Sequence, residues 1–244
     1  MRAWGEGRKH ALRTYRSLQV IAAPLVRGLF RIQRVGIKKI PKKGPVILVT
    51  NHESNIDPVL VVCSMGRPIF HLGKHTLFTK PFRSWFFQTL GGQIPVNREG
   101  GGNDAAIQAA VTALKKGFAL GIYPEAHRSP DGRLRRGKPG LGRIAYLSGA
   151  PVYPVAVDGT FEVWPKGKAM PTFFKRTKVL VGEPRKYAKD AALAADHAAC
   201  QAVTDDLMGD IARLLGQSYD PKTAPPARHV DTPKTIQGKP GSQP

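Results

Sequence analysis

Cysteines, acidic residues and long apolar runs are all scarce in this 244-residue sequence. The only two cysteines, Cys63 and Cys200, lie far apart, and neither has the neighbours of a zinc site. They exclude a disulfide framework and favour a reducing cytosol. No stretch approaches the ~18 consecutive apolar residues that indicate a membrane-spanning helix. A protein that crosses the bilayer is therefore not expected.

Lysine and arginine outnumber aspartate and glutamate by 38 to 17, which gives a formal net charge of +21 at pH 7. Such an excess favours an anionic partner, which could be nucleic acid, an anionic bilayer surface or a phosphorylated substrate. The sequence contains no helix-turn-helix, zinc-finger or aromatic stacking motif, so we expect no nucleic acid partner. The length fits one α/β domain with a sizeable core.

Residues 8–39 combine many basic side chains with apolar residues spaced three or four apart, as at Leu18, Ile21 and Leu25. This pattern predicts an amphipathic helix, which Pro24 should kink or split. A basic amphipathic segment favours a position in the membrane interface, where each Lys or Arg near an anionic leaflet contributes ~1 kcal/mol. The alternative is a helix that packs its apolar stripe on the domain. We interpret residues 1–39 as a membrane-association segment.

From residue 40 onward, short apolar stretches alternate with helical patterns, which predicts an α/β domain over residues 40–216. The predicted strands cover residues 46–49, 69–72, 93–96, 118–123, 152–157 and 179–181, and the predicted helices cover residues 82–90, 105–116, 141–148 and 190–215. Residues 217–244 contain almost no large apolar side chain and are expected to be disordered.

Residues 51–57 place a histidine and a carboxylate five positions apart, directly after a predicted buried strand. Because Pro58 suits the first turn of a helix, Asp57 is expected to cap a helix that begins there. On one continuous helix, side chains five apart would point about 140° away from each other. A turn can instead bring His52 back to Asp57, and strand ends are where open α/β sheets usually place their chemistry. We therefore predict a catalytic pair; the alternative is a cap and an unrelated loop histidine.

Two further strand ends carry polar groups: Arg98 follows one predicted strand, and Glu125 and Arg128 follow another. Guanidinium groups bind phosphate in a two-pronged geometry, so two arginines at one edge of a sheet predict a phosphorylated substrate. Lys74, which follows a third predicted strand, is a weaker candidate. Taken singly, Arg98 could be a solvated loop residue, and Glu125 and Arg128 could form a local ion pair worth ~0–1 kcal/mol.

Four sequence blocks together resemble the 1-acylglycerol-3-phosphate acyltransferase (lysophosphatidic acid acyltransferase) family. Residues 51–57 match its Asn-His-x-Ser-x-x-Asp signature, residues 92–98 resemble its second block, residues 123–129 its third (usually Phe-Pro-Glu-Gly-Thr-Arg-Ser) and residues 150–155 its fourth. The blocks occur in order over roughly residues 35–185. The resemblance implies a glycerol-3-phosphate acyltransferase-like α/β fold with a mixed, mainly parallel central sheet flanked by helices.

The resemblance also implies a reaction, O-acyl transfer from acyl-CoA or acyl-carrier protein to the free hydroxyl of 1-acylglycerol-3-phosphate, which gives phosphatidic acid. His52 would act as general base, and Asp57 would hold the imidazole in the right tautomer, as in a serine triad whose serine is replaced by the substrate hydroxyl. Backbone N–H groups are expected to stabilise the oxyanion. No metal and no bound cofactor are expected, since the acyl donor is a substrate.

For the remaining candidates, the resemblance implies that Arg98 and Arg128, with Lys74 as a weaker candidate, bind the phosphate of the acceptor. Glu125 would orient the acceptor or Arg128. The expected partners are a lysophospholipid acceptor, the acyl donor and an anionic membrane surface. The expected location is peripheral or monotopic, on the cytoplasmic face of the plasma membrane.

The chain departs from the family at Ala126 and His127, where Gly-Thr is usual. Glycine permits backbone angles that cost other residues energy, so either this turn is of another kind or the acceptor pocket has changed shape. The acceptor therefore stays open, and glycerol 3-phosphate, a lyso-ornithine lipid or a glycolipid are alternatives. More distant alternatives are a basic nucleic-acid- or membrane-binding protein without catalysis and an inactive membrane-binding homologue.

Overall fold

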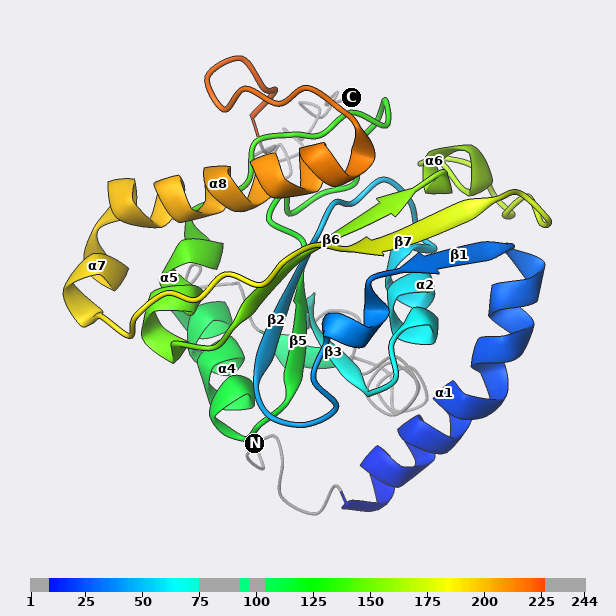
Figure 1. The fold of residues 1–244 in the computed structure, drawn as a ribbon, viewed down its shortest axis with the longest axis horizontal. Coiled ribbons are helices and arrows are strands. Elements are labelled where there is room, and N and C mark those ends of the chain that lie inside the picture. Colours follow the sequence, from blue (N-terminus) through cyan, green and yellow to red (C-terminus); the bar gives the residue numbers. More distant parts are fainter. Residues whose placement is uncertain (1–8, 75–92, 97–103, 227–244) are drawn as a thin grey trace, which may run out of the picture.

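The computed structural model describes residues 9–74, 93–96 and 104–226, and a seven-stranded sheet forms its centre (Figure 1). The strands are β1 (Ile32–Val35), β2 (Val46–Thr50), β3 (Ile69–Lys74), β4 (Gln93–Val96), β5 (Ala119–Ile122), β6 (Val152–Asp158) and β7 (Thr177–Val181), in the order β1-β7-β6-β2-β5-β3-β4. The five strands from β6 to β4 run parallel, whereas β7 is antiparallel to β6 and parallel to β1. The expected mixed, mainly parallel sheet is confirmed.

Helices cover both faces of the sheet. They are α1 (Lys9–Leu29), α2 (Asp57–Ser64), α4 (Asp104–Lys115), α5 (Gly140–Ser148), α6 (Thr160–Val163), α7 (Ala191–Ala195) and α8 (His197–Leu215), with a 3₁₀ turn η1 (Ile37–Lys39). In Figure 1, α4, α5 and α8 lie on one side of the sheet, and α1 and α2 lie on the other. Alternate residues of β2 feed the two cores, Ile47 and Val49 one of them and Val46 and Leu48 the other. This burial on both faces explains the unbroken apolar run of β2.

Helix α1 continues through Pro24 as one element and curves along its length (Figure 1), so of the two expected effects of Pro24, a kink or a split, the split does not occur. Polar contacts attach it to the body: the Gln19 amide donates to the carbonyl oxygens of Val62 and Met65 at 2.6 and 3.0 Å, at the end of α2. Arg27 donates to the carbonyl oxygen of Cys63 at 2.6 Å. These contacts satisfy carbonyl groups that the end of α2 leaves without partners. They attach α1 to the body even though part of its apolar stripe stays exposed.

Two parts of the chain fold differently from their sequence pattern. The helix ends at Leu29, and residues 32–35, which the pattern places in the amphipathic segment, form the edge strand β1. The single predicted helix 190–215 is divided into α7 and α8, because the Asp196 carboxylate accepts hydrogen bonds from the first N–H groups of α8.

The segment 217–226, expected to be part of a disordered tail, packs on the body. Tyr219 lies against the core, and the carbonyl oxygen of Pro225 accepts a hydrogen bond from the Arg136 N–H at 2.9 Å. The contact of Tyr219 with the core thus accompanies an ordered segment, although the composition around it is polar. The predicted helix 82–90 and residues 227–244 lie outside the described residues. No helix in the described ranges is long and apolar enough to cross a bilayer.

Candidate active site

The carboxyl ends of β2 and β5 bring two sequence motifs together, because these strands are parallel neighbours with Val49 paired to Ile122. The main-chain N–H of His52 donates to Oε1 of Glu125 at 2.9 Å. On the other side of the same residue, the Ser129 N–H donates to the carbonyl oxygen of His52 at 2.7 Å. The loop after β5 thus holds the backbone of His52 at two points.

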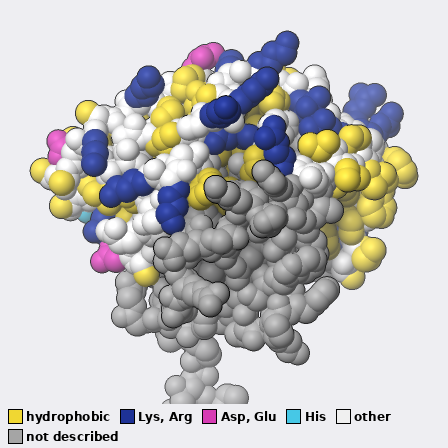
Figure 2. All heavy atoms as spheres, turned by 90° about the horizontal axis from the view of Figure 1, so that it is seen from below, with side chains coloured by type: hydrophobic (Ala, Val, Ile, Leu, Met, Phe, Trp, Pro, Cys, Tyr) yellow, Lys and Arg dark blue, Asp and Glu magenta, His cyan; other side chains and the backbone are white. Residues whose placement is uncertain are grey.

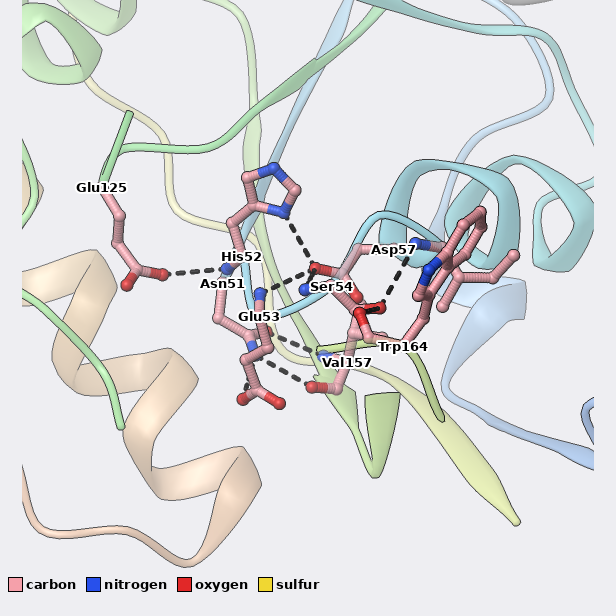
Figure 3. Close-up of polar contacts among 9 residues, drawn as sticks. Asn51, His52, Glu53, Ser54, Asp57, Glu125, Val157 and Trp164 are labelled. Carbon is pink, nitrogen blue, oxygen red and sulfur yellow. Dashed lines mark hydrogen bonds and ion pairs between the residues drawn. The ribbon is translucent and has the colours of Figure 1, made fainter. Parts of the chain in front are cut away.

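The imidazole of His52 meets the carboxylate of Asp57, with 2.8 Å between Nδ1 and Oδ2 (Figure 3). The same oxygen accepts hydrogen bonds from the N–H groups of Glu53 and Ser54 at 2.7 and 2.8 Å. The Asp57 side chain is fully buried, and that of His52 is 19% exposed. In Figure 3 the other ring nitrogen, Nε2, points away from Asp57. A proton on Nδ1 leaves Nε2 as a free base.

Asp57 does not cap its helix as expected. It is the first residue of α2, and Pro58 follows it in the first turn. However, its Oδ2 is turned back onto the preceding turn, where three donors converge on it. Its Oδ1 is buried and has no hydrogen-bond partner among the described residues. The turn from His52 to Asp57 is therefore organised around this carboxylate.

Asn51 and Ser54, to which the sequence assigned no role, hold the same turn. The Asn51 amide accepts from the Val157 N–H and donates to the Val157 carbonyl, both at 2.8 Å, which extends the pairing of β2 with β6. The hydroxyl of Ser54 donates to the carbonyl oxygen of Trp164 at 2.7 Å. Their position inside the seven-residue motif was the one signal that could have identified them.

Glu125 makes contacts that its position in the sequence did not predict. It is 1% exposed, and its two oxygens accept hydrogen bonds from the main-chain N–H groups of His52 and Arg135, at 2.9 and 3.1 Å. Each oxygen thus bonds a main-chain N–H group, and neither of these two bonds involves Arg128. Burial raises the pKa of Glu125 to about 8, although the two N–H donors act in the opposite direction. Burial and the nearby Asp57 likewise raise the pKa of Glu53 to about 8.

A cavity of about 300 Å³ opens beside the imidazole of His52. Among its lining residues, Tyr123 stacks on His52 and on His71, with ring centroids 4.4 and 5.6 Å apart. His71 fits here because Gly121, its register partner on β5, has no side chain; a Cβ there would lie 2.4 Å from Nε2 of His71. Burial and the neighbouring His52 lower the pKa of His71 to about 4, so this ring is neutral.

Sequence reasoning treated His71 only as a strand residue and missed it as part of the site. Its Nε2, Oε1 of Gln93 and the hydroxyl of Tyr123 are buried without hydrogen-bond partners in the part of the chain that the structure describes. All three residues line the cavity. Buried polar atoms normally have partners, so this lining favours a polar occupant.

The cationic candidates have different outcomes. Arg128 is half-buried on the loop that bonds the backbone of His52, and its Nη1 is buried with no hydrogen-bond partner among the described residues. Lys74 is the last residue of β3, next to Gly73 of the cavity lining, but its side chain is not described. Arg98 lies outside the described residues. Arg128 is thus the one of the three whose surroundings are known.

Ala126 lines the cavity with a backbone φ of 62°, in the left-handed region. The turn is therefore the kind that favours glycine, and the idea of a different turn is wrong. Ala126 itself forms part of the cavity wall. In the described ranges, no cluster of three or more His, Cys, Asp or Glu side chains is arranged to hold a metal ion.

Comparison with known proteins identifies relatives of this chain. It is 27% identical over 157 residues to a chloroplastic 1-acyl-sn-glycerol-3-phosphate acyltransferase of Arabidopsis thaliana, which covers 64% of this chain and 44% of the relative. It is 32% identical over 126 residues to a 1-acyl-sn-glycerol-3-phosphate acyltransferase of Borreliella burgdorferi, covering 51% of this chain and 50% of that protein. The chain thus spans about half the length of these curated relatives.

The fold has a counterpart among solved structures, the crystal structure of the 1-acyl-sn-glycerophosphate (LPA) acyltransferase PlsC from Thermotoga maritima. The TM-score is 0.64 at 23% sequence identity, over 90% of this chain and 86% of that one. The model of the Acyltransferase family matches residues 31–158, more than half of the chain, and this range includes the His52–Asp57 pair and the loop after β5. The chain therefore belongs to the Acyltransferase family.

Proposed function

We propose that the protein transfers a fatty acyl group from an acyl-thioester to the free hydroxyl of 1-acyl-sn-glycerol-3-phosphate, which gives phosphatidic acid. The observation that carries the proposal is the 2.8 Å contact between His52 and Asp57, beside a cavity that the imidazole itself lines. The two relatives named as 1-acyl-sn-glycerol-3-phosphate acyltransferases support the choice of acceptor.

A hydroxyl is a poor nucleophile at neutral pH and needs a base within hydrogen-bond reach. In the proposed reaction, Nε2 of His52 removes the hydroxyl proton while the oxygen attacks the thioester carbonyl. A C–O bond forms and the C–S bond breaks, and the imidazolium then returns the proton to the departing thiolate. Asp57 stabilises the imidazolium through Nδ1. No acyl-enzyme and no bound cofactor are required, since acyl-CoA or acyl-carrier protein is a substrate.

We assign the acceptor phosphate to Arg128, together with Arg98 and, as a weaker candidate, Lys74. The support for Arg128 is its buried Nη1, which has no hydrogen-bond partner among the described residues and lies on the loop that bonds His52. A guanidinium with an unsatisfied donor is suited to a phosphate oxygen. Arg98 and Lys74 remain proposals from sequence position alone.

The lysophospholipid acceptor and the phosphatidic acid product are poorly soluble in water. We therefore place the enzyme on an anionic membrane surface, peripherally and on the cytoplasmic face. Removing each methylene of an acyl chain from the bilayer costs about 0.8 kcal/mol, which makes full extraction of a long chain prohibitive. Helix α1 supports this location, because Val20, Ile21 and Leu25 stay exposed on a helix that also carries arginines.

An acceptor screen tests the proposal. Purified protein is incubated with radiolabelled acyl-CoA or acyl-carrier protein and with one acceptor at a time: 1-acylglycerol-3-phosphate, glycerol 3-phosphate, a lyso-ornithine lipid or a glycolipid. The expected result is labelled phosphatidic acid with the first acceptor and no product with His52→Ala. If only another acceptor is acylated, the proposed acyl transfer stands and the proposed acceptor is wrong. Ala126 in the cavity wall would explain that outcome. Absence of transfer to every acceptor would contradict the proposal.

A further inference from the structure

The connection between α6 and β7, residues 164–176, exposes large apolar side chains to solvent. Met170, Phe173 and Phe174 are 66%, 43% and 65% exposed. The same segment, which we name the 164–176 loop, carries four cations and no acidic residue: Lys166, Lys168, Lys175 and Arg176. All four cations are exposed. An apolar patch framed by cations is the composition of an interfacial membrane contact.

Hydrogen bonds hold the backbone of the loop that carries these exposed side chains. The Thr172 N–H donates to the carbonyl oxygen of Val163 at 2.9 Å, and the indole N–H of Trp164 donates to the carbonyl oxygen of Lys168 at 2.8 Å. Phe174 has a φ of 63°, a conformation that costs a non-glycine residue roughly 1 kcal/mol or more. The structure therefore maintains an unfavourable backbone at a residue whose ring faces water, which favours a functional reason for it.

The 164–176 loop is continuous with the end of α1. The Phe174 N–H donates to the carbonyl oxygen of Leu29 at 2.7 Å, and the rings of Phe30 and Phe173 lie 5.6 Å apart. In Figure 1 this loop and the end of α1 lie at the same side of the molecule. Figure 2 shows hydrophobic side chains gathered at that edge beside lysine and arginine side chains. The two segments thus form one mixed apolar and basic surface.

This surface is also tied to the candidate active site. Trp164, the first residue of the loop, accepts a hydrogen bond from the Ser54 hydroxyl through its carbonyl oxygen. Ser54 in turn donates its N–H to Asp57. A bilayer that contacts the loop would therefore lie at a fixed position relative to the turn that holds His52.

We propose that the 164–176 loop is a second lipid-contacting element, in addition to α1. Met170, Phe173 and Phe174 enter the boundary between headgroups and acyl chains of an anionic bilayer, and the four cations contact lipid phosphates. An anionic bilayer is chosen over a protein partner because the three apolar side chains are surrounded by cations on a loop with no acidic residue. The proposal goes beyond the proposed function, and vesicle binding can be measured without catalysis.

The first experiment is flotation of the full-length chain with vesicles of phosphatidylcholine, with and without phosphatidylglycerol. The double variant Met170→Ser/Phe174→Asn removes the two most exposed tips, and asparagine tolerates the left-handed backbone at 174. We expect binding to anionic vesicles at least tenfold weaker than that of the parent chain. Leu193→Ser, which removes an exposed apolar side chain of α7 on the opposite side of the molecule (Figure 1), is the matched control and should bind normally.

The second experiment tests the charges. Lys166→Gln/Lys175→Gln should weaken binding to anionic vesicles severalfold and leave binding to neutral vesicles unchanged. The control pair Lys186→Gln/Lys189→Gln replaces exposed lysines on the connection from β7 to α7. It should weaken binding to anionic vesicles less and also leave binding to neutral vesicles unchanged. Equal losses in the two pairs would mean that total charge, not this loop, determines binding, and would overturn the proposal.

Circular dichroism establishes that each variant is folded, and the single variant Met170→Ser provides a milder change. Parent-like flotation of the folded double variant would overturn the proposal. If that variant also lost binding to acyl-carrier protein, an acidic protein would be the occupant of this surface. Weaker vesicle binding supports the proposal whether or not acyl transfer is detected. Failure of the lipid-contact proposal can therefore be told apart from failure of the proposed function.

Discussion

The main-chain N–H of His52 donates a hydrogen bond to the carboxyl group of Glu125, across 73 residues of sequence and 2.9 Å of space. This contact exists because β2 and β5 are parallel neighbours whose carboxyl ends meet. We propose from it that Glu125 positions the base, whereas the sequence-based proposal is that Glu125 orients the acceptor or Arg128. The distinction has a kinetic consequence, because a positioning residue affects turnover more than substrate affinity.

Replacing Glu125 with glutamine separates these two roles. The new side chain would keep one acceptor oxygen but present an NH₂ group to one of two main-chain N–H donors, and so displace the backbone of His52. We expect kcat to fall by on the order of 10- to 100-fold, with little change in the acceptor KM. Steady-state kinetics in detergent micelles measure both constants, and Glu162→Gln, an exposed acid of α6, is the control. A raised KM with parent-like kcat would return Glu125 to the substrate site.

Asp57→Asn tests how the imidazole is held. Asparagine keeps the size of the side chain but cannot stabilise an imidazolium, and it favours the wrong tautomer of His52. We expect a loss of kcat on the order of 10³- to 10⁴-fold. Asp158→Asn, which breaks a more exposed ion pair with Lys178, should leave kcat unchanged. If Asp57 only organises the turn, the melting temperature of Asp57→Asn will fall while turnover of the folded fraction stays normal.

Ala126→Gly should stabilise the protein. The left-handed φ of 62° costs alanine roughly 1 kcal/mol that glycine avoids, so the free energy of unfolding should rise by about that amount. Ala202→Gly, in the middle of α8, is the matched control and should lower it by about 0.5–1 kcal/mol. Urea denaturation measures both. A destabilised Ala126→Gly would show that the Ala126 side chain contributes more to stability than the backbone strain costs.

Two buried carboxyl groups make stability depend on pH. The pKa values of Glu53 and Glu125 are raised to about 8 in the folded chain, from an ordinary 4.5. Between these values the folded protein keeps protons that the unfolded chain has released. The stabilisation is therefore complete below about pH 4.5 and is lost as the pH rises through about 8, by up to ~1.4 kcal/mol per pH unit for each group.

His71 acts in the opposite direction, but only at lower pH. Its pKa falls from 6.5 to about 4, so it costs stability as the pH drops below about 6.5 and has no effect above it. Urea denaturation at pH 6.5 and pH 8 therefore isolates the carboxyl groups. Stability should decrease between these two values, and the decrease should be about half as large in Glu53→Gln. An identical decrease in that variant would show that Glu53 is ionised throughout.

The features that can be predicted from the sequence are those that depend on a short stretch of residues, such as the bounds of buried strands. The buried strands β2 and β6 are found within about one residue of their predicted bounds, because apolar runs carry their signal. The spacing of residues 51–57 also predicts that His52 and Asp57 can meet, as they do at 2.8 Å. Strand β1 was missed because Ile32–Val35 is a mostly exposed edge strand, which depends on pairing with β7.

The rest of the site depends on strand order, which no local pattern contains. Glu125 bonds the backbone of His52 because β5 lies beside β2. His71 reaches Tyr123 because Gly121, on the neighbouring strand, leaves room for its ring. Each residue looks ordinary in its own segment, and its role follows only from what the sheet places beside it.

The most direct test of the proposed mechanism is the turnover of His52→Ala with acyl-thioester and 1-acylglycerol-3-phosphate. The proposed mechanism predicts that transfer falls to the background rate. Circular dichroism and melting temperature should stay close to those of the parent chain, since the backbone of residue 52 keeps its bonds to Glu125 and Ser129. Turnover within tenfold of the parent value in this folded variant would contradict it, because no base would then be needed at Nε2.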